Sequence, residues 1–370
     1  MERNDKKMKK KIIFYLSSLT KGGAQRVILN LTESLLKKEY EVVIVTTLEE
    51  ENEYELPGGA KRILSDLTPE EITKSRWKNL KHRYLKLRNI WKKEKPDIIV
   101  SFIGKNNIMA IVTSLGLKIP VAVSVRGEPT EEYYNKVLRF LAKYLFRFAS
   151  GIILQTKKSQ QFFPKKTLQK AVVLPNPLNS VFLEKPYEGE KEKKIVLVGR
   201  IDSNKNQRMA VQAFAKIHEK FPEYHMEIWG EGEDRDSLFS YVKELGLKDK
   251  IFLPGATNQV KEKLETATLY VLPSNTEGMP NSLMEAMALG IPSISTDCPC
   301  GGPAELITDG FDGLLVPVGK VNPMAEAMER VLSDNDLREK LSINSLKIKE
   351  RLDPIAVNNQ WEEYLNSLTR

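Results

Sequence analysis

The chain alternates short apolar runs with longer amphipathic stretches. In the first half the apolar runs predict buried strands, and a stretch such as 24–38, with apolar residues at helical spacing, predicts a helix. Strands that alternate with helices are typical of a parallel sheet covered on both faces. The strands expected in this half are Lys11–Leu16, Glu41–Thr46, Asp97–Phe102, Val121–Val125 and Gly151–Thr156.

The pattern breaks once and then starts again. Prolines and a charged stretch at 175–194 interrupt it, which predicts a linker between domains. Helices are expected beyond this break at 207–221 and 236–245. The strands expected there are Ile195–Val198, His225–Trp229, Ile251–Leu253, Leu269–Leu272, Ser293–Ser295 and Leu314–Val316.

The fold predicted from this pattern is α/β, with two doubly wound, Rossmann-like parallel-sheet domains facing a central cleft. The N-terminal domain is expected over 1–178, the linker over 179–194 and the C-terminal domain over 195–353. A last amphipathic helix is expected over 354–370, with the option of packing back on the N-terminal domain.

Composition narrows the class of protein. With 370 residues, 41% of them hydrophobic, the chain suits two globular domains. No apolar run approaches the roughly 18 residues of a membrane-spanning helix. The two cysteines, Cys298 and Cys300, are too close for an easy disulfide and too few for a metal site. We therefore expect a cytoplasmic protein without a bound metal or cofactor.

Charge is distributed unevenly between the two halves. Residues 1–187 hold 35 Lys and Arg against 19 Asp and Glu, so 35 − 19 = +16, and the remainder holds 22 against 30, or −8. These values sum to the net charge of +8. The basic first half predicts an anionic partner, for which nucleic acid, anionic lipid and a phosphorylated acceptor are the candidates. We expect an anionic membrane surface, since no nucleic-acid module is recognisable.

The densest basic segment is 74–95. It carries an apolar stripe, and the cations around it suit an anionic interface. The other interpretation, which we favour for the stripe itself, is that it packs on its own sheet. Further cations occur at Lys6–Lys11 and over Lys136–Arg147. The stripe consists of Trp77, Leu80, Tyr84, Leu87 and Trp91.

The strongest chemical signal is a polar turn at the end of a strand. Glu277 lies in this turn, a helix begins near Asn281, and Glu285 follows one turn into that helix. Helix N-termini favour anions and hydroxyl groups, and the two carboxylates can both reach a ligand placed there. Spacing alone leaves open that both carboxylates are merely solvated.

Two further loops carry suitable chemistry. Arg200 and Lys205 follow a strand and together suit a diphosphate. Gly22 and Gly23 lie between the first strand and the first helix, where missing side chains let the backbone approach a phosphate. Each signal is weak alone, because surface cations and an ordinary turn explain them equally well.

Taken together, the motifs resemble the retaining GT-B glycosyltransferases of family 4, the "glycosyl transferases group 1" domain. The resemblance covers nearly the whole chain and is most specific over 198–205 and 274–290. It implies that Arg200 and Lys205 hold the diphosphate of a UDP-sugar, that Glu285 binds the ribose and that Glu277 binds the transferred sugar. It also implies donor contacts at Gly22, Gly23, Val260, Gly278, Met279, Pro280, Asn281 and Ser282.

One position departs from the family pattern. Many members have a histidine where this chain has Arg126, directly after the strand expected at 121–125. Arginine cannot act as a base, but it can hydrogen-bond a sugar hydroxyl or stabilise leaving-group charge. Arg126 and Glu277 are therefore our two expected catalytic residues.

The function expected from the resemblance is metal-independent, retaining transfer of a hexose or N-acetylhexosamine. The donor is expected to be a UDP-sugar and the acceptor a lipid-linked glycan at the inner face of the cell membrane, in cell-surface polysaccharide synthesis. Two alternatives stay open: a GT-B-fold nucleotide-sugar epimerase, and a non-catalytic scaffold that binds nucleotide-sugar.

Overall fold

The computed structural model describes residues 9–369, and the chain divides into two compact units. Unit 1 comprises residues up to Pro177 together with Ile355 onward, and unit 2 comprises Leu178–Pro354. The basic residues expected to act at Lys6 and Lys7 lie outside the described residues. Among the helices of the described chain, none is long and apolar enough to cross a membrane.

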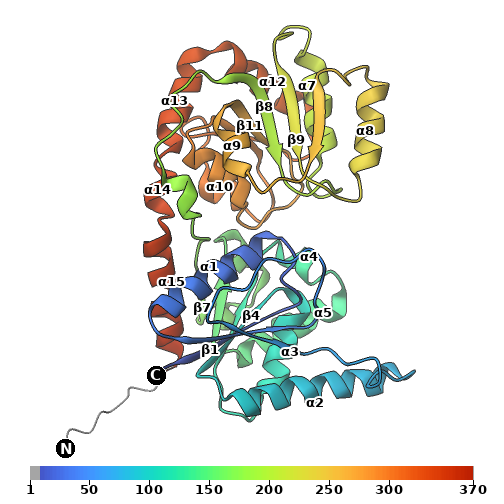
Figure 1. The fold of residues 1–370 in the computed structure, drawn as a ribbon, viewed down its shortest axis with the longest axis vertical. Coiled ribbons are helices and arrows are strands. Elements are labelled where there is room, and N and C mark those ends of the chain that lie inside the picture. The colour runs from blue at the N-terminus through green and yellow to red at the C-terminus, as the bar shows by residue number, and fades with distance from the viewer. Residues whose placement is uncertain (1–8, 370) are drawn as a thin grey trace, which may run out of the picture. The chain divides into compact units, whose positions relative to one another are not determined.

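Unit 1 is built on a parallel sheet in the order β3-β2-β1-β4-β5-β6-β7 (Figure 1). Its strands, within the described residues, are β1 (Lys11–Leu16), β2 (Glu41–Thr46), β3 (Lys61–Leu64), β4 (Ile98–Phe102), β5 (Val121–Ser124), β6 (Gly151–Leu154) and β7 (Ala171–Val173). Its α-helices are α1 (Gly23–Lys37), α2 (Arg76–Glu94), α3 (Gly104–Ser114), α4 (Pro129–Glu132), α5 (Lys136–Leu145), α6 (Lys165–Leu168) and α15 (Pro354–Leu368). Short 3-10 turns are η1 (Phe146–Phe148) and η2 (Lys158–Phe162).

Both faces of this sheet are buried, which explains the uninterrupted apolar runs. Along β1, Ile12 and Phe14 belong to one core and Ile13 and Tyr15 to another, because successive side chains point to opposite faces. Helices α1 and α15 contribute to the first core, whereas α2, α3 and α5 contribute to the second. The sheet is therefore a central layer between two layers of helices.

Two strands were missed by the sequence analysis, β3 and β7. They form the two edges of the sheet and have only four and three residues, none of them fully buried. An edge strand lacks a second neighbour, and its side chains stay partly solvated. β3 has two cations among its four residues, and the apolar run of β7 is only three residues long, so neither stands out in the sequence.

Unit 2 repeats the architecture with the strand order β10-β9-β8-β11-β12-β13. Its strands are β8 (Glu192–Val198), β9 (His225–Trp229), β10 (Ile251–Gly255), β11 (Ala267–Leu272), β12 (Ser293–Thr296) and β13 (Leu314–Val316). Its helices are α7 (Gln207–Ile217), α8 (Arg235–Glu244), α9 (Val260–Glu265), α10 (Asn281–Ala288), α11 (Gly302–Leu306), α12 (Val321–Ser333), α13 (Asn335–Ser345) and α14 (Ile348–Arg351), preceded by the 3-10 turn η3 (Ser180–Leu183).

The segment expected as a linker, 179–194, differs from expectation. It belongs to unit 2, where Phe182 of η3 is buried and packs with α10 residues, and β8 already begins at Glu192. The chain passes between the units at 177–178 and again at 354–355. The prolines therefore mark an ordered connection rather than a free linker.

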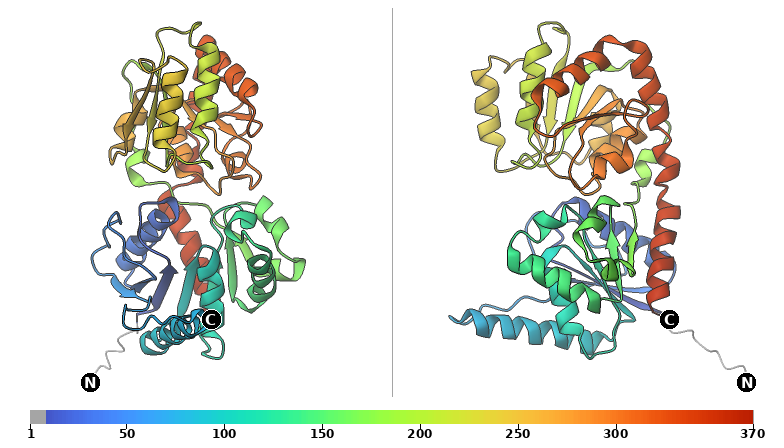
Figure 2. Two further views of the ribbon diagram at one scale, coloured as in Figure 1. Left: turned by 90° about the vertical axis from the view of Figure 1, so that its right-hand side faces the viewer. Right: turned by 180° about the vertical axis from the view of Figure 1, so that it is seen from behind.

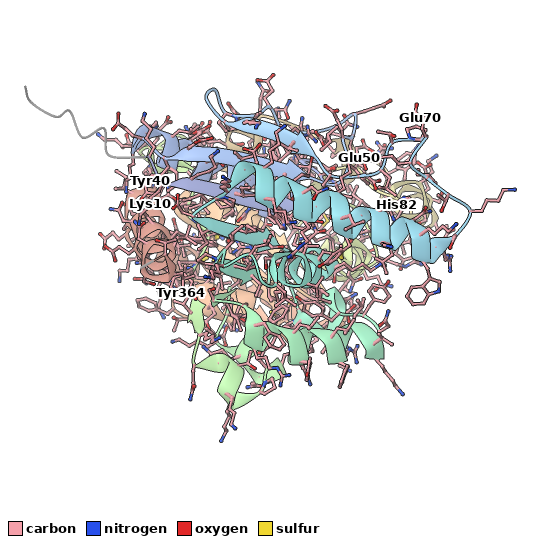
Figure 3. The ribbon with its side chains drawn as sticks, turned by 90° about the horizontal axis from the view of Figure 1, so that it is seen from below. Lys10, Tyr40, Glu50, Glu70, His82 and Tyr364 are labelled. Atoms are coloured by element: carbon pink, nitrogen blue, oxygen red, sulfur yellow. The ribbon has the colours of Figure 1, made fainter. Side chains whose placement is uncertain are left out.

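Helix α15 closes one face of unit 1 (Figure 2). Trp361 is fully buried, stacks on Phe102 with 6.1 Å between ring centroids, and donates from Nε1 to the carbonyl oxygen of Pro175 at 3.2 Å. Tyr364 donates to the carbonyl oxygen of Lys170 at 2.8 Å, and Asn366 donates to the hydroxyl of Tyr40 at 2.8 Å. Figure 3 shows Tyr40 and Tyr364 beside this helix. The last segment of the chain is thus part of the unit 1 core.

Replacing Trp361 with alanine should lower the free energy of unfolding of unit 1 by about 3–5 kcal/mol, because the cavity left behind cannot close completely. The matched control is Ile355→Ala on the same helix, since Ile355 is 72% exposed and should change stability by less than about 0.5 kcal/mol. Chemical denaturation measures the free energy of unfolding of both variants, and calorimetry provides a second measurement. Equal destabilisation by the two substitutions would show that α15 is not integral to unit 1.

Candidate donor site in unit 2 and a buried arginine in unit 1

Strand order defines where each unit should bind a ligand. In unit 2, β9 and β10 follow on one side of β8, and β11 to β13 follow on the other. Ligands of doubly wound sheets bind at the carboxyl ends of the two strands where the order reverses. The loops after β8 and β11 carry Arg200, Lys205 and Glu277, so the residues singled out from sequence lie at this position.

These two loops are joined by hydrogen bonds that link Asn204 to Asn275 and Thr276. The side-chain oxygen of Asn204 accepts from the backbone N–H of Thr276 at 3.0 Å, and its amide donates to the Thr276 carbonyl oxygen at 3.0 Å. The backbone N–H of Asn275 donates to the Asn204 carbonyl oxygen at 2.7 Å. The hydrogen bonds fix the two loops relative to each other, which fixes the charged residues on them.

Lys205 and Glu277 form an ion pair across the two loops. Glu277 also accepts a hydrogen bond from the hydroxyl of Ser274 at 2.6 Å. The side chains of Lys205 and Glu277 are 22% and 10% exposed, so the pair lies in a partly desolvated position. The ammonium group is compensated by a carboxylate here, and a bound anion would have to compete for it.

Arg200 is placed differently from Lys205. Its side chain is 72% exposed, and its Nε donates to Asp202 at 2.5 Å. Asp202 also accepts from the backbone N–H of Lys205 at 2.8 Å, so this carboxylate shapes the loop and restrains the arginine. Asp202 engages one of the five guanidinium N–H donors, and the other four, on the two Nη atoms, can donate to a ligand.

Glu285 lies in α10 and is only 3% exposed. Nearby, the hydroxyl of Tyr270 donates to Ser282 at 2.7 Å. Burial raises the pKa of Tyr270, and the negative charges of Glu277 and Glu285 raise it further. Glu277 lies in the turn that precedes α10, and Glu285 lies within that helix.

The turn between Glu277 and α10 is held by a close approach of another loop. A Cβ atom on Gly302 would lie 1.4 Å from the carbonyl oxygen of Gly278, so only glycine fits there. Val260 and Met279 both pack at the edge of one apolar core beneath α10. A cavity of about 650 Å³ lies further along the sheet, at the ends of β12 and β13, and is lined by none of the predicted residues.

In unit 1, Gly22 and Gly23 precede α1 at the carboxyl end of β1. Gly22 has extended backbone and is the N-cap of the helix, whose first turn carries no acidic residue. Gly23 is exposed. Strands β1 and β4 are neighbours with the reversal of order between them, so this turn occupies the switch point of the unit 1 sheet.

Arg126 lies two residues past the end of β5 and is only 8% exposed. Its guanidinium carbon lies 5.6 Å from the ring of Phe102 and 5.7 Å from the ring of Trp361, and it donates one hydrogen bond to Asn176. Within the described residues its Nε and Nη1 have no hydrogen-bond partner. Burial lowers the pKa of Arg126 to about 9, and Glu132 partly opposes this shift.

Glu132 fixes the backbone around Arg126. Its carboxylate accepts hydrogen bonds from the backbone N–H groups of Gly104, Arg126 and Gly127. Burial raises the pKa of Glu132, whereas these three donors and the nearby guanidinium lower it. The loops after β4 and β5 are therefore tied by one carboxylate. Because Glu132 accepts from the backbone and not from the side chain of Arg126, the guanidinium keeps unused donors.

Several residues of these sites were missed from sequence. Asp202 and Ser274 belong to the motifs that the sequence analysis quoted, and each lies three residues from the charged side chain that it holds. Glu132 and Trp361 had no signal, because their partners are set by the packing of distant segments.

Comparison with solved structures defines the fold as that of the GT-B glycosyltransferases. An Anabaena protein, HepE, solved with UDP, superimposes with a TM-score of 0.81 at 18% identity, over 96% of this chain and 100% of the other. Sucrose-phosphate synthase from Thermosynechococcus elongatus gives a TM-score of 0.83 at 18% identity, over 97% and 99%. These likenesses show the fold.

The family follows from sequence. The model described as "Glycosyl transferases group 1" matches residues 182–348, and that described as "Glycosyltransferase Family 4" matches residues 21–180. An α-1,4-N-acetyl-D-galactosaminyltransferase of Campylobacter jejuni, named for a diphospho-undecaprenol-linked substrate, is 30% identical over 96% of this chain and 97% of its own. A galactosyltransferase of Escherichia coli, named for UDP-Gal, is 27% identical over 73% and 77%. The chain therefore belongs to the family 4 glycosyltransferases, with the glycosyl transferases group 1 domain in its second half.

Replacing Arg126 with methionine should leave unit 1 as stable as the natural protein, or about 1–3 kcal/mol more stable, because a buried charge with unused donors costs free energy. Burial lowers the pKa of folded Arg126 to about 9, below that of the same residue in the unfolded chain, so the unfolded state binds more protons above pH 9 and the natural protein should gain stability on the variant as the pH rises. Urea unfolding at neutral and alkaline pH measures both effects.

Arg139→Met is the matched control for this substitution. Arg139 donates to the carbonyl oxygens of Tyr133 and Thr130, so its replacement should destabilise unit 1. If Arg126→Met destabilised unit 1 as much as Arg139→Met, the guanidinium would be structural, not held in reserve for a ligand.

Proposed function

We propose that this chain is a retaining glycosyltransferase that moves a hexose or N-acetylhexosamine from a UDP-sugar to a lipid-linked glycan acceptor. The observation that carries the proposal is the Lys205–Glu277 pair at the switch point of unit 2. It combines a cation suited to the diphosphate with a carboxylate suited to sugar hydroxyls. Both can be exchanged for ligand groups without leaving a buried charge unpaired.

The relatives support the choice of substrates. The Campylobacter jejuni relative is named for a diphospho-undecaprenol-linked acceptor, and the Escherichia coli relative for UDP-Gal. HepE was solved with UDP, with UDP and glucose, and with UDP-glucose. We extend these substrate classes to this chain, and place its reaction at the cytoplasmic face of the cell membrane in cell-surface polysaccharide synthesis.

In the proposed complex the donor displaces the internal ion pair. The diphosphate takes Lys205 and the exposed Arg200, which supply the positive charge that a metal ion supplies in other transferases. Glu277 is then free to accept hydrogen bonds from the sugar, and Glu285 accepts from the ribose. The start of α10, at Met279–Ser282, meets sugar hydroxyls and phosphate.

Three further contacts complete the donor site. Val260 lies against the base, as the family resemblance implies. The family resemblance also implies donor contacts at Gly22 and Gly23, where no side chain keeps a phosphate from the backbone. Arg126 uses its unpaired donors for a sugar hydroxyl or for the developing charge of the leaving group.

Transfer then proceeds on one face of the sugar. The acceptor oxygen forms a bond to the anomeric carbon on the side from which UDP departs, and the bond from that carbon to the diphosphate oxygen breaks. The acceptor proton passes to the departing phosphate, so charge and atoms balance without a covalent enzyme intermediate. The anomeric configuration of the donor is thereby kept.

Lys205→Ala should weaken UDP binding by about 10- to 150-fold, corresponding to the loss of a charge-assisted hydrogen bond of about 1.5–3 kcal/mol. Glu277→Gln is the informative partner variant. It should leave UDP affinity unchanged or raise it, since Glu277 competes for Lys205 in the free protein, yet it should abolish sugar transfer. Calorimetric titration with UDP and a turnover assay separate these effects. Unchanged UDP affinity of Lys205→Ala would remove Lys205 from the donor site.

The stereochemistry of the product tests the reaction class. A thermal-shift screen should find stabilisation by UDP-sugars rather than GDP-sugars, and the donor so identified should give an α-linked product from an α-linked donor. The anomeric proton coupling in the NMR spectrum of the product reports this configuration. A β-linked product would contradict retention, and conversion of the donor to its epimer without acceptor would establish the epimerase alternative.

A further inference from the structure

Helix α5 and the following turn η1 carry aromatic side chains on the surface. Val137 is 67% exposed, Phe140 66%, Tyr144 45% and Phe148 48%. These residues recur at three- and four-residue spacing, so they form one stripe. The opposite face of α5, through Leu138 and Leu141 among others, packs on the unit 1 core. Core packing therefore accounts for the inner face of this helix and leaves the aromatic outer face unexplained.

The stripe is ordered by its own contacts. The rings of Phe140 and Tyr144 stack with 6.0 Å between centroids, and Phe148 meets Tyr144 edge-on at 6.2 Å. The guanidinium carbon of Arg147 lies 3.7 Å from the ring centroid of Tyr144. An arginine held flat over exposed rings keeps its N–H donors available at the rim of the stripe.

The charged residues of the segment that carries the stripe have one sign. From Tyr133 to Leu183 the sequence contains no aspartate and no glutamate. Elements α5, η1, η2 and α6 all fall in this acid-free segment, which Figure 2 shows in green on one side of unit 1. Its cations are Lys136, Arg139, Lys143, Arg147, Lys157, Lys158, Lys165, Lys166 and Lys170.

Helix α2, the other basic helix, has a different character. Its stripe is split: Leu87 and Trp91 are buried in the core as expected, but Trp77 is 80% exposed and Leu80 48%, so the expectation that the whole stripe packs inward was wrong. Several of its cations are neutralised locally, since Arg83 pairs with Asp66 and Lys86 with Glu71. Figure 3 shows His82 on this helix, away from α5.

We infer that the α5–η1 stripe is the surface through which this protein binds an anionic lipid bilayer. Aromatic rings on a convex helix face suit the boundary between headgroups and acyl chains, and lysine and arginine stems extend their charges to the headgroups. A segment of 51 residues without a carboxylate, counting from Tyr133 to Leu183, avoids repulsion from an extended anionic surface. The residues of this surface, on α5 and η1, are different from those proposed to bind the donor.

The inference is consistent with a lipid-linked acceptor but does not depend on the proposed function, because the binding test needs neither donor nor acceptor. The test is flotation of the full chain with vesicles of phosphatidylcholine alone or with a third of it replaced by phosphatidylglycerol. The natural protein should bind the anionic vesicles, and this binding should weaken at high salt. It should hardly bind the neutral vesicles at all.

Three variants locate the surface. The charge variant Lys136→Gln, Lys143→Gln, Arg147→Gln should bind anionic vesicles on the order of 100-fold more weakly, at roughly fivefold per cation. The aromatic variant Phe140→Ser, Tyr144→Ser should lose about tenfold or more. The matched control Lys78→Gln, Lys92→Gln, Lys93→Gln removes the same charge from α2 and should lose less than about threefold. All four proteins should keep the same UDP affinity and thermal unfolding midpoint, which excludes misfolding.

Equal binding to neutral and anionic vesicles would overturn the inference, as would a loss by the α2 control equal to that of the charge variant. So would binding of single-stranded DNA as tight as vesicle binding and indifferent to the aromatic variant, because that result identifies a general polyanion surface. If vesicles bind as expected while a lipid-linked acceptor is never glycosylated, the proposed function fails and this inference stands.

Discussion

The parallel register of the two sheets is the constraint on which the rest of this structure depends. Because every strand runs the same way, the loops after β8 and β11 emerge at one edge, and hydrogen bonds through Asn204 and Thr276 can then join them. That joint sets Lys205 against Glu277 although 72 positions separate them in sequence. In unit 1 the same rule puts the loops after β4 and β5 together, where the carboxylate of Glu132 ties them.

Each unit contains a cationic side chain that could bind a ligand, Lys205 in unit 2 and Arg126 in unit 1, but within the described residues only the first is paired with a carboxylate in the free protein. In unit 2, Lys205 is compensated by a carboxylate that a ligand can replace, so the free protein avoids the cost of an unpaired charge. In unit 1, Arg126 is buried against two aromatic rings with donors left unused, so the free protein bears that cost. A residue kept at such a cost points to function, because stability alone would favour an apolar side chain.

Most of the fold could be predicted from the sequence because buried parallel strands form apolar runs, as in β1, β2 and β11. The edge strands β3 and β7 could not, since they are short and partly solvated. The sequence alone could bring Glu277 and Glu285 together, because they lie on one turn and the helix that follows it. The pairing of Lys205 with Glu277 needed the β8–β11 adjacency, and the stacking of Trp361 over Arg126 needed α15 to return to unit 1, and neither leaves a trace in local sequence. The aromatic outer face of α5 was equally hidden, because spacing alone does not say which side of a helix is buried.

A crystal structure of the UDP complex tests the central claim most directly, since that claim is an exchange of partners at Lys205. The account predicts that the Lys205 ammonium group moves from Glu277 to the diphosphate, that Arg200 joins it, and that Glu285 accepts from the ribose hydroxyls. UDP bound elsewhere in unit 2, or bound with the Lys205–Glu277 pair intact, would contradict it.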